Sequence, residues 1–210
     1  SFFGVWVEQL VAESVGKIGK GILPAEGETD LENSDYANDR LFVAMALAND
    51  TVVEDSVNSL KAAGKPVIQI KLTDVYDLGR EFFAWEFATA VAGAVMKVHP
   101  FDQPNVEQAK IVARAIIAEY KEKGALKELP LSCEENGIKV VGAGEISSIK
   151  ESLAHLTAAF VESTPRSYFS LQAYVTPNAE ITAALQEFRT KLAKKHKAAV
   201  TVGFGPRFLH

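Results

Sequence analysis

A glutamate near the end of a predicted helix is the first residue of this sequence that could do chemistry. Apolar residues recur with helical spacing over residues 4–15, and the pattern stops where glycines arrive, so Glu13 is expected in the last turn of the helix. The negative end of the helix dipole disfavours a carboxylate at that place, which suits a general base. A glutamate that is simply exposed on the helix surface is the commoner case, and the sequence leaves both interpretations open.

Gln103 and Lys110 form a second candidate group. The glutamine lies in a short segment between Pro100 and Pro104, and the lysine follows seven residues later. A helix that begins near Pro104 would place both side chains on the same side of the helix, about two turns apart, so that they could bind one ligand together. Two prolines also fix the backbone around Asp102 and the glutamine, although a stiff joint between two helices is the more common reason for such a segment.

Two glycine-rich segments have some features of phosphate-binding loops. Residues 16–21 read Gly-Lys-Ile-Gly-Lys-Gly, but Ile22 stands where a P-loop lysine belongs, and a helix rather than a strand precedes them. Residues 142–144 precede a predicted helix, but Ser147 occupies the place of the third glycine of a dinucleotide fingerprint. A loop that ends the preceding helix is the favoured interpretation of the first segment, and the second carries little weight.

The order of the predicted elements indicates an α/β fold. Because parallel strands need crossover connections, this order predicts a three-layer, mostly parallel sheet with helices on both faces. Ligands of such sheets bind at the carboxyl ends of the strands, which points to the loops after Leu47, Leu72 and Phe204. The expected strands are residues 41–47, 66–72, 138–141, 168–175 and 198–204, and the expected helices are residues 4–15, 53–63, 78–97, 106–121, 146–160 and 179–196.

Composition and charge exclude several classes of partner. The chain has 210 residues, 48% of them hydrophobic, so it can bury a real core. Its formal net charge of −5 offers no general attraction to a phosphate backbone, and we expect no nucleic acid partner. The longest apolar run, residues 82–96, is interrupted by Glu86 and is too short for a bilayer span, so we expect no membrane partner either. The start at Ser1 without methionine suggests a cut chain.

Cysteine and histidine usage gives no sign of a metal site. Cys133 is the single cysteine, so no internal disulfide can form, which fits a reducing compartment, and we expect the protein in the cytoplasm. The four histidines do not cluster in sequence, and no metal ligand set has the usual spacing. His210 follows the last predicted strand, where a binding site could lie.

Three blocks of the sequence resemble one family of enzymes. Residues 82–86 (Phe-Phe-Ala-Trp-Glu) lead to residues 99–110 (His-Pro-Phe-Asp-Gln-Pro-Asn-Val-Glu-Gln-Ala-Lys), and residues 12–17 read Ala-Glu-Ser-Val-Gly-Lys. These blocks resemble the signatures of glucose-6-phosphate isomerases, with departures at His99, Asn105 and Val15, where many members have Asn, Gly and Asn. Residues 202–210 are similar to the C-terminal segment of bifunctional transaldolase/glucose-6-phosphate isomerases.

The resemblance implies a fold, an activity and roles for residues. It implies a second sugar-isomerase domain over residues 1–130, followed by a C-terminal α/β extension over residues 131–210. The implied reaction interconverts glucose 6-phosphate and fructose 6-phosphate without a metal or organic cofactor. Glu13 would be the catalytic base, Lys110 would assist ring opening, Gln103 would hold the sugar, and His210 is one possible ring-opening histidine.

The resemblance also implies partners for the chain. The substrate would be a sugar phosphate, and an N-terminal half of the same protein would hold its phosphate and stabilise the enediolate. We therefore expect the 210 residues alone to be inactive, and the parent protein to be a homodimer. The alternative is a non-catalytic domain that binds sugar phosphates or mediates dimerisation, which would not need Glu13.

Overall fold

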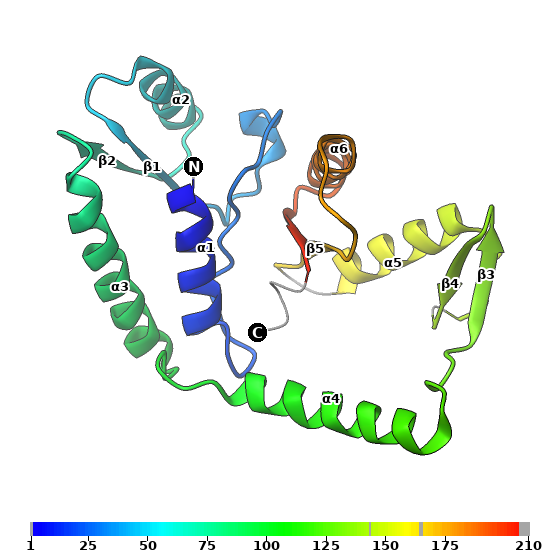
Figure 1. The fold of residues 1–210 in the computed structure, drawn as a ribbon. Helices are drawn as coiled ribbons and strands as arrows, with labels where there is room; N and C mark the ends of the chain where they lie inside the picture. The colour runs from blue at the N-terminus through cyan, green and yellow to red at the C-terminus, as the bar shows by residue number, and fades with distance from the viewer. Residues whose placement is uncertain (1, 143, 164–165, 206–210) are drawn as a thin grey trace. The chain divides into compact units, whose positions relative to one another are not determined.

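A computed structural model describes residues 2–142, 144–163 and 166–205 (Figure 1). Contacts within the chain divide it into two compact units. The first comprises residues 1–105 and 169–210, and the second comprises residues 106–168.

The first unit begins with helix α1 (Phe2–Val15), whose apolar side faces helix α3 (Asp77–Met96). Val11 and Val15 are buried together with Val98, which lies just after α3. Burial of these aliphatic side chains removes apolar surface from water, which is the main force that holds the two helices together. The core is extended by partly buried neighbours, namely Val7, Trp85 and Met96.

A β-α-β unit lies between these two helices in the sequence. Strands β1 (Phe42–Leu47) and β2 (Val67–Leu72) are parallel and in register along their whole length, and helix α2 (Thr51–Ala62) connects them (Figure 1). The helix begins where the side chain of Asp50 accepts a hydrogen bond from the backbone N–H of Val53 at 3.2 Å. A short 3-10 turn, η1 (Asn33–Asp35), interrupts the long loop that precedes β1.

The C-terminal part of the first unit is a second strand-helix-strand segment. It consists of β5 (Tyr168–Ala173), α6 (Ala179–His196) and β6 (Ala199–Phe204). The two strands pair with each other, and their core contains Leu192, Ala193 and Val200. Leu31, from the loop before β1, packs against this core, so the N-terminal loop and the C-terminal segment share one apolar cluster.

The second unit contains helix α4 (Pro104–Lys123) over most of its length, a hairpin and helix α5 (Ile149–Ser163). Strands β3 (Leu131–Glu135) and β4 (Ile138–Val141) of the hairpin are antiparallel. Asn136 and Gly137 between them have φ angles of 52° and 78°, and two left-handed residues are what a tight hairpin turn requires. Strand β4 was predicted over residues 138–141, whereas β3, its antiparallel partner, was not predicted as a strand.

The predicted α/β class is confirmed, and the predicted helices and the other strands lie close to their expected positions. In the described residues the strands pair two by two, as β1–β2, β3–β4 and β5–β6. Among the same residues, no helix is long and apolar enough to cross a membrane. No group of three or more His, Cys, Asp or Glu side chains is placed there to hold a metal ion. The predicted domain boundary at residue 130 stays a prediction.

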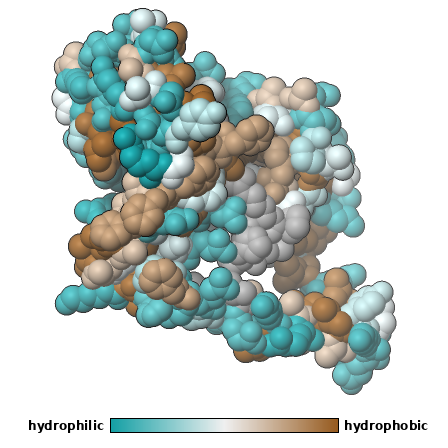
Figure 2. All heavy atoms as spheres, turned by 60° about the vertical axis from the view of Figure 1, so that its left-hand side comes forward, coloured by the Kyte–Doolittle hydropathy of each residue, from teal (hydrophilic) through white to brown (hydrophobic). Residues whose placement is uncertain are grey.

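Large apolar side chains reach the surface in several places. On α3, Phe83, Phe87 and Val95 expose 69%, 63% and 76% of their surface, and they recur at spacings of four and eight residues along one side of the helix. Figure 2 shows apolar patches beside hydrophilic ones on the face that it presents. Part of the apolar surface of this chain is therefore not covered by its own described residues.

His196, the last residue of α6, predicts a pH dependence of stability. Its Nε2 atom is buried and has no hydrogen-bond partner among the described residues. Burial lowers the pKa of His196 below its ordinary value of 6.5, and Lys195 acts in the same direction. A depressed folded-state pKa means that protonation favours the unfolded chain, so stability is lost as the pH falls below 6.5.

We therefore expect the urea midpoint of the wild-type chain to fall more steeply than that of His196→Gln between about pH 7.5 and pH 5.5. Equal slopes for the two proteins would contradict this assignment.

Candidate functional site

The connection after α1 is a tight turn built by two lysines. The backbone N–H of Lys17 donates to the carbonyl of Lys20, and the reverse bond is also formed, both at 3.0 Å. Ile18 and Gly19 between them have φ angles of 50° and 72°. The segment therefore ends the helix, as the sequence predicts, and returns the chain on itself within four residues.

Lys17 reaches from this turn to the segment between α3 and α4. Its side chain is only 6% exposed, and its ammonium donates to the carbonyl of His99 at 2.9 Å and to Oδ1 of Asp102 at 3.2 Å. A third bond goes to the backbone carbonyl of Asp102. An ammonium has three protons, so all three have an acceptor here, which is the arrangement that a buried lysine needs.

The joint between α3 and α4 is itself folded tightly. Helix α3 ends at Lys97, whose left-handed φ angle of 56° turns the chain back. Pro100 then packs against Gly93 of the helix. The approach is so close that a Cβ atom at position 93 would lie 3.2 Å from the proline ring. Lys20 adds a hydrogen bond to the carbonyl of Met96 at 2.8 Å, at the carboxyl end of α3, where a cation is favoured.

The hydrogen bonds of the Lys17 side chain bring together the segments that carry two predicted site residues. Glu13 is four residues before Lys17, and Gln103 directly follows Asp102. Both side chains are exposed, and the carboxylate of Glu13 accepts a long hydrogen bond of 3.5 Å from Gln9. An exposed carboxylate and an exposed amide are therefore presented by two segments that one buried lysine connects.

The two other predicted site residues belong to other parts of the chain. Lys110 is an exposed residue of α4 and belongs to the second compact unit. His210 lies outside the described residues.

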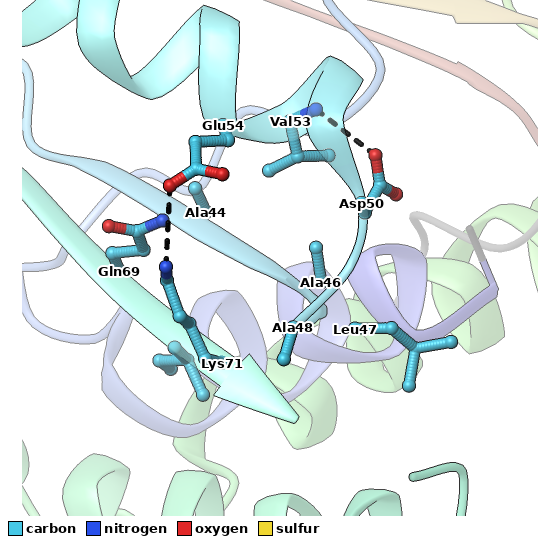
Figure 3. A pocket seen from close by; sticks show the side chains of 10 residues that line it. Ala44, Ala46, Leu47, Ala48, Asp50, Val53, Glu54, Gln69 and Lys71 are labelled. Carbon is cyan, nitrogen blue, oxygen red and sulfur yellow. Dashed lines mark hydrogen bonds and ion pairs between the residues drawn. The ribbon is translucent and has the colours of Figure 1, made fainter. Parts of the chain in front are cut away.

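A small hollow lies between α2 and the sheet in the first unit (Figure 3). Lys71 of β2 and Glu54 of α2 form an ion pair of 3.4 Å across it, and alanines of β1 form part of its wall. A second, open hollow lies at the carboxyl ends of β1 and β2, next to Asn49 and Thr73. Neither Glu13 nor Gln103 lines either of these hollows. The second hollow lies at the loops after Leu47 and Leu72, where the sequence predicts a ligand, and this stays a prediction.

Lys17 is the residue that sequence reasoning missed. The sequence shows a lysine just beyond the end of a helix, where the dipole favours a cation. It also shows an isolated Asp102 held between two prolines. Nothing local connects these two signals, because 85 residues separate the side chains that meet.

Comparison with known proteins identifies relatives. A glucose-6-phosphate isomerase of Heliobacterium modesticaldum is 32% identical over 165 residues, which cover 58% of this chain and 36% of that protein. A probable glucose-6-phosphate isomerase of Haloarcula marismortui is 29% identical over 150 residues, which cover 55% and 34%. The corresponding enzyme of Leptospira biflexa is 28% identical over 143 residues, which cover 50% and 32%.

This chain spans about a third of the length of the curated relatives that it matches. No family model matches the chain, and no solved structure matches it. The resemblance to glucose-6-phosphate isomerases that the motifs predict is confirmed by these relatives, over about half of the chain.

Proposed function

We propose that this chain supplies the base-bearing part of a glucose-6-phosphate isomerase active site. Glu13 is the general base, Gln103 holds the sugar, and Lys110 assists the opening of the ring. The observation that carries the proposal is the bridge of Lys17 to the segment at His99 and Asp102. This bridge links the end of α1, which carries the Glu13 carboxylate, to the segment next to the Gln103 amide. The relatives of the chain are named glucose-6-phosphate isomerases, which supports the same reaction.

The chemistry is a proton transfer next to a carbonyl group. In the open-chain aldose, the carboxylate of Glu13 removes the proton from C2, the C2–H electron pair forms a double bond to C1, and the carbonyl oxygen takes up a proton. The product of this step is a cis-enediol. The same carboxyl group then returns its proton to C1, while the hydroxyl at C2 loses its proton and becomes the ketone. This loss balances the proton that the oxygen at C1 took up, and one base on one side of the sugar serves both carbon atoms.

The remaining parts of the active site are assigned to other segments. An N-terminal portion of the same protein binds the phosphate of the substrate, and without that anchor little binding energy is left to orient the sugar. The ring-opening histidine is His210 or a residue beyond this chain. We further propose a homodimer in the cytoplasm, with no metal or organic cofactor. A fused transaldolase domain stays a prediction from the C-terminal motif.

Deuterium transfer tests the proposed reaction. The complete protein that contains this chain, incubated with fructose 6-phosphate in heavy water, should form glucose 6-phosphate that carries deuterium at C2. The label is expected because the carboxylate of Glu13 is exposed and exchanges its proton with solvent. Nuclear magnetic resonance of the product measures both conversion and label.

Two outcomes of this experiment decide between the candidate functions. Binding of the sugar phosphate by calorimetry without any conversion would favour the non-catalytic domain and reject the isomerase. The 210-residue chain alone serves as the comparison and should convert no substrate above the rate of buffer. Turnover by the isolated chain would reject the assignment of phosphate binding to another segment.

A further inference from the structure

The contacts of Lys17 have a more specific consequence for the candidate site. Its side chain is 6% exposed, and its acceptors are two backbone carbonyls and one carboxylate of the segment at residues 99–102. The backbone carbonyls fix the path of that segment rather than one side chain on it. Because Gln103 is the next residue, its position relative to the end of α1 depends on this lysine.

Lys17 is also held firmly at its own end. Its backbone N–H and carbonyl both pair with Lys20, and Val15, two residues earlier, is fully buried between α1 and α3. The ammonium therefore extends from a backbone that has little freedom. Preorganisation of this kind is what a site needs if two groups on different segments must contact one substrate.

We infer that Lys17 is a positioning residue, which fixes Gln103 relative to Glu13 and does not itself contact the substrate. The inference rests on the proposed function, because it assigns Lys17 to the same site. A displacement of about 1 Å in a positioning group can cost as much as 100-fold in rate. Loss of the ammonium should therefore lower turnover although it removes no reacting atom.

Lys20 provides a matched comparison within the same turn. It is exposed, and its ammonium donates to the carbonyl of Met96, three residues before the segment that Lys17 holds. Replacement of either lysine by methionine removes one charge and keeps the length of the side chain. Only the replacement of Lys17 should change the placement of Gln103.

The test measures steady-state kinetics of the complete protein with Lys17→Met, Lys20→Met, Gln103→Ala and the double variant Lys17→Met/Gln103→Ala. We expect kcat of Lys17→Met to fall about 10- to 100-fold and that of Lys20→Met to change less than about 3-fold. In the Gln103→Ala background, Lys17→Met should cost less than about 3-fold, because residues that act through each other are not additive. Hydrogen exchange at the amides of residues 101–103 should become faster in Lys17→Met alone.

The outcomes separate the two proposals. A wild-type protein that does not isomerise its substrate rejects the proposed function. An active wild type whose Lys17→Met variant folds and keeps its kcat, or whose double variant is fully additive, rejects the positioning role and leaves the proposed function standing. If Lys17→Met does not fold, Asp102→Ala replaces it in the same cycle, and full additivity with Gln103→Ala then overturns the inference.

Discussion

Replacement of Glu13 by glutamine in the complete protein is expected to lower kcat for glucose 6-phosphate by about 100- to 10,000-fold, which is the usual contribution of a general base. The amide keeps the size and hydrogen-bonding capacity of the carboxylate but cannot accept the C2 proton. Since Glu13 is exposed and bonded only weakly to Gln9, the change should leave the fold and the substrate affinity nearly unaltered. Coupled-assay kinetics measure kcat, and calorimetry measures binding.

Glu187→Gln is the control for this prediction. Glu187 is an exposed carboxylate on α6 that pairs with Lys191, and its loss should leave kcat within about twofold, because exposed ion pairs contribute little. If Glu13→Gln retained full activity, Glu13 could not be the base. Substrate binding with no activity even in the wild type would instead favour the non-catalytic domain.

Replacement of Arg189 by methionine is expected to lower the free energy of unfolding by about 2–5 kcal/mol, since it leaves one buried and one half-buried acceptor without a charged donor. Arg189 is 3% exposed and lies in the middle of the C-terminal part of the first unit. Its Nε donates to the carbonyl of Val200 at 2.8 Å, and a terminal nitrogen donates to the carbonyl of Glu26 at 2.7 Å. One side chain thus connects β6 to the N-terminal loop.

Burial disfavours the charged form of the Arg189 side chain, and nearby carboxylates favour it. Burial lowers the pKa of Arg189 below its usual value, and the neighbouring carboxylates, with Glu28 first among them, oppose that shift. Methionine fills part of the volume and makes neither hydrogen bond. Urea unfolding followed by circular dichroism measures the loss as a lower midpoint.

Lys191→Met is the matched control for Arg189→Met. It lies two residues further along α6, is exposed, and forms an ion pair with Glu187 on the same helix. Its replacement should change the free energy of unfolding by less than about 0.5 kcal/mol. A loss of less than about 1 kcal/mol for Arg189→Met, which is about the net contribution of one ordinary hydrogen bond, would show that the two carbonyls find other donors.

Elements with strong local signals could be predicted from the sequence. Helix α6 occupies the predicted residues because Asn178 caps its start, accepting from the backbone N–H of Ile181 at 2.8 Å, and Lys197 ends it in a left-handed conformation. Strand β1 is an unbroken apolar run and was predicted within one residue. Strand β3 reads Leu-Ser-Cys-Glu-Glu, which has no strand pattern of its own, and it exists because β4 pairs with it.

The positions of Glu13 and Gln103 in the chain's elements could be predicted from the sequence, but the contact that relates their two segments could not. Glu13 lies in the last turn of α1 as predicted, and Gln103 lies directly before the first residue of α4. The contact that relates them depends on a lysine whose acceptors are mostly backbone carbonyls. Backbone carbonyls occur at every residue, so no side-chain pattern reveals which of them a distant lysine will reach.

The two edges of the β1–β2 sheet differ in the charge of the strand that forms them. Within the described part of the chain each strand has one hydrogen-bonded neighbour, so each keeps one row of backbone donors and acceptors for an additional strand. Charged side chains, lysine above all, oppose such additions at a sheet edge. Strand β2 carries Lys71, whereas β1 reads Phe-Val-Ala-Met-Ala-Leu and carries no charge. The sheet is therefore most open to growth beside β1, where an incoming strand would meet an uncharged, apolar template.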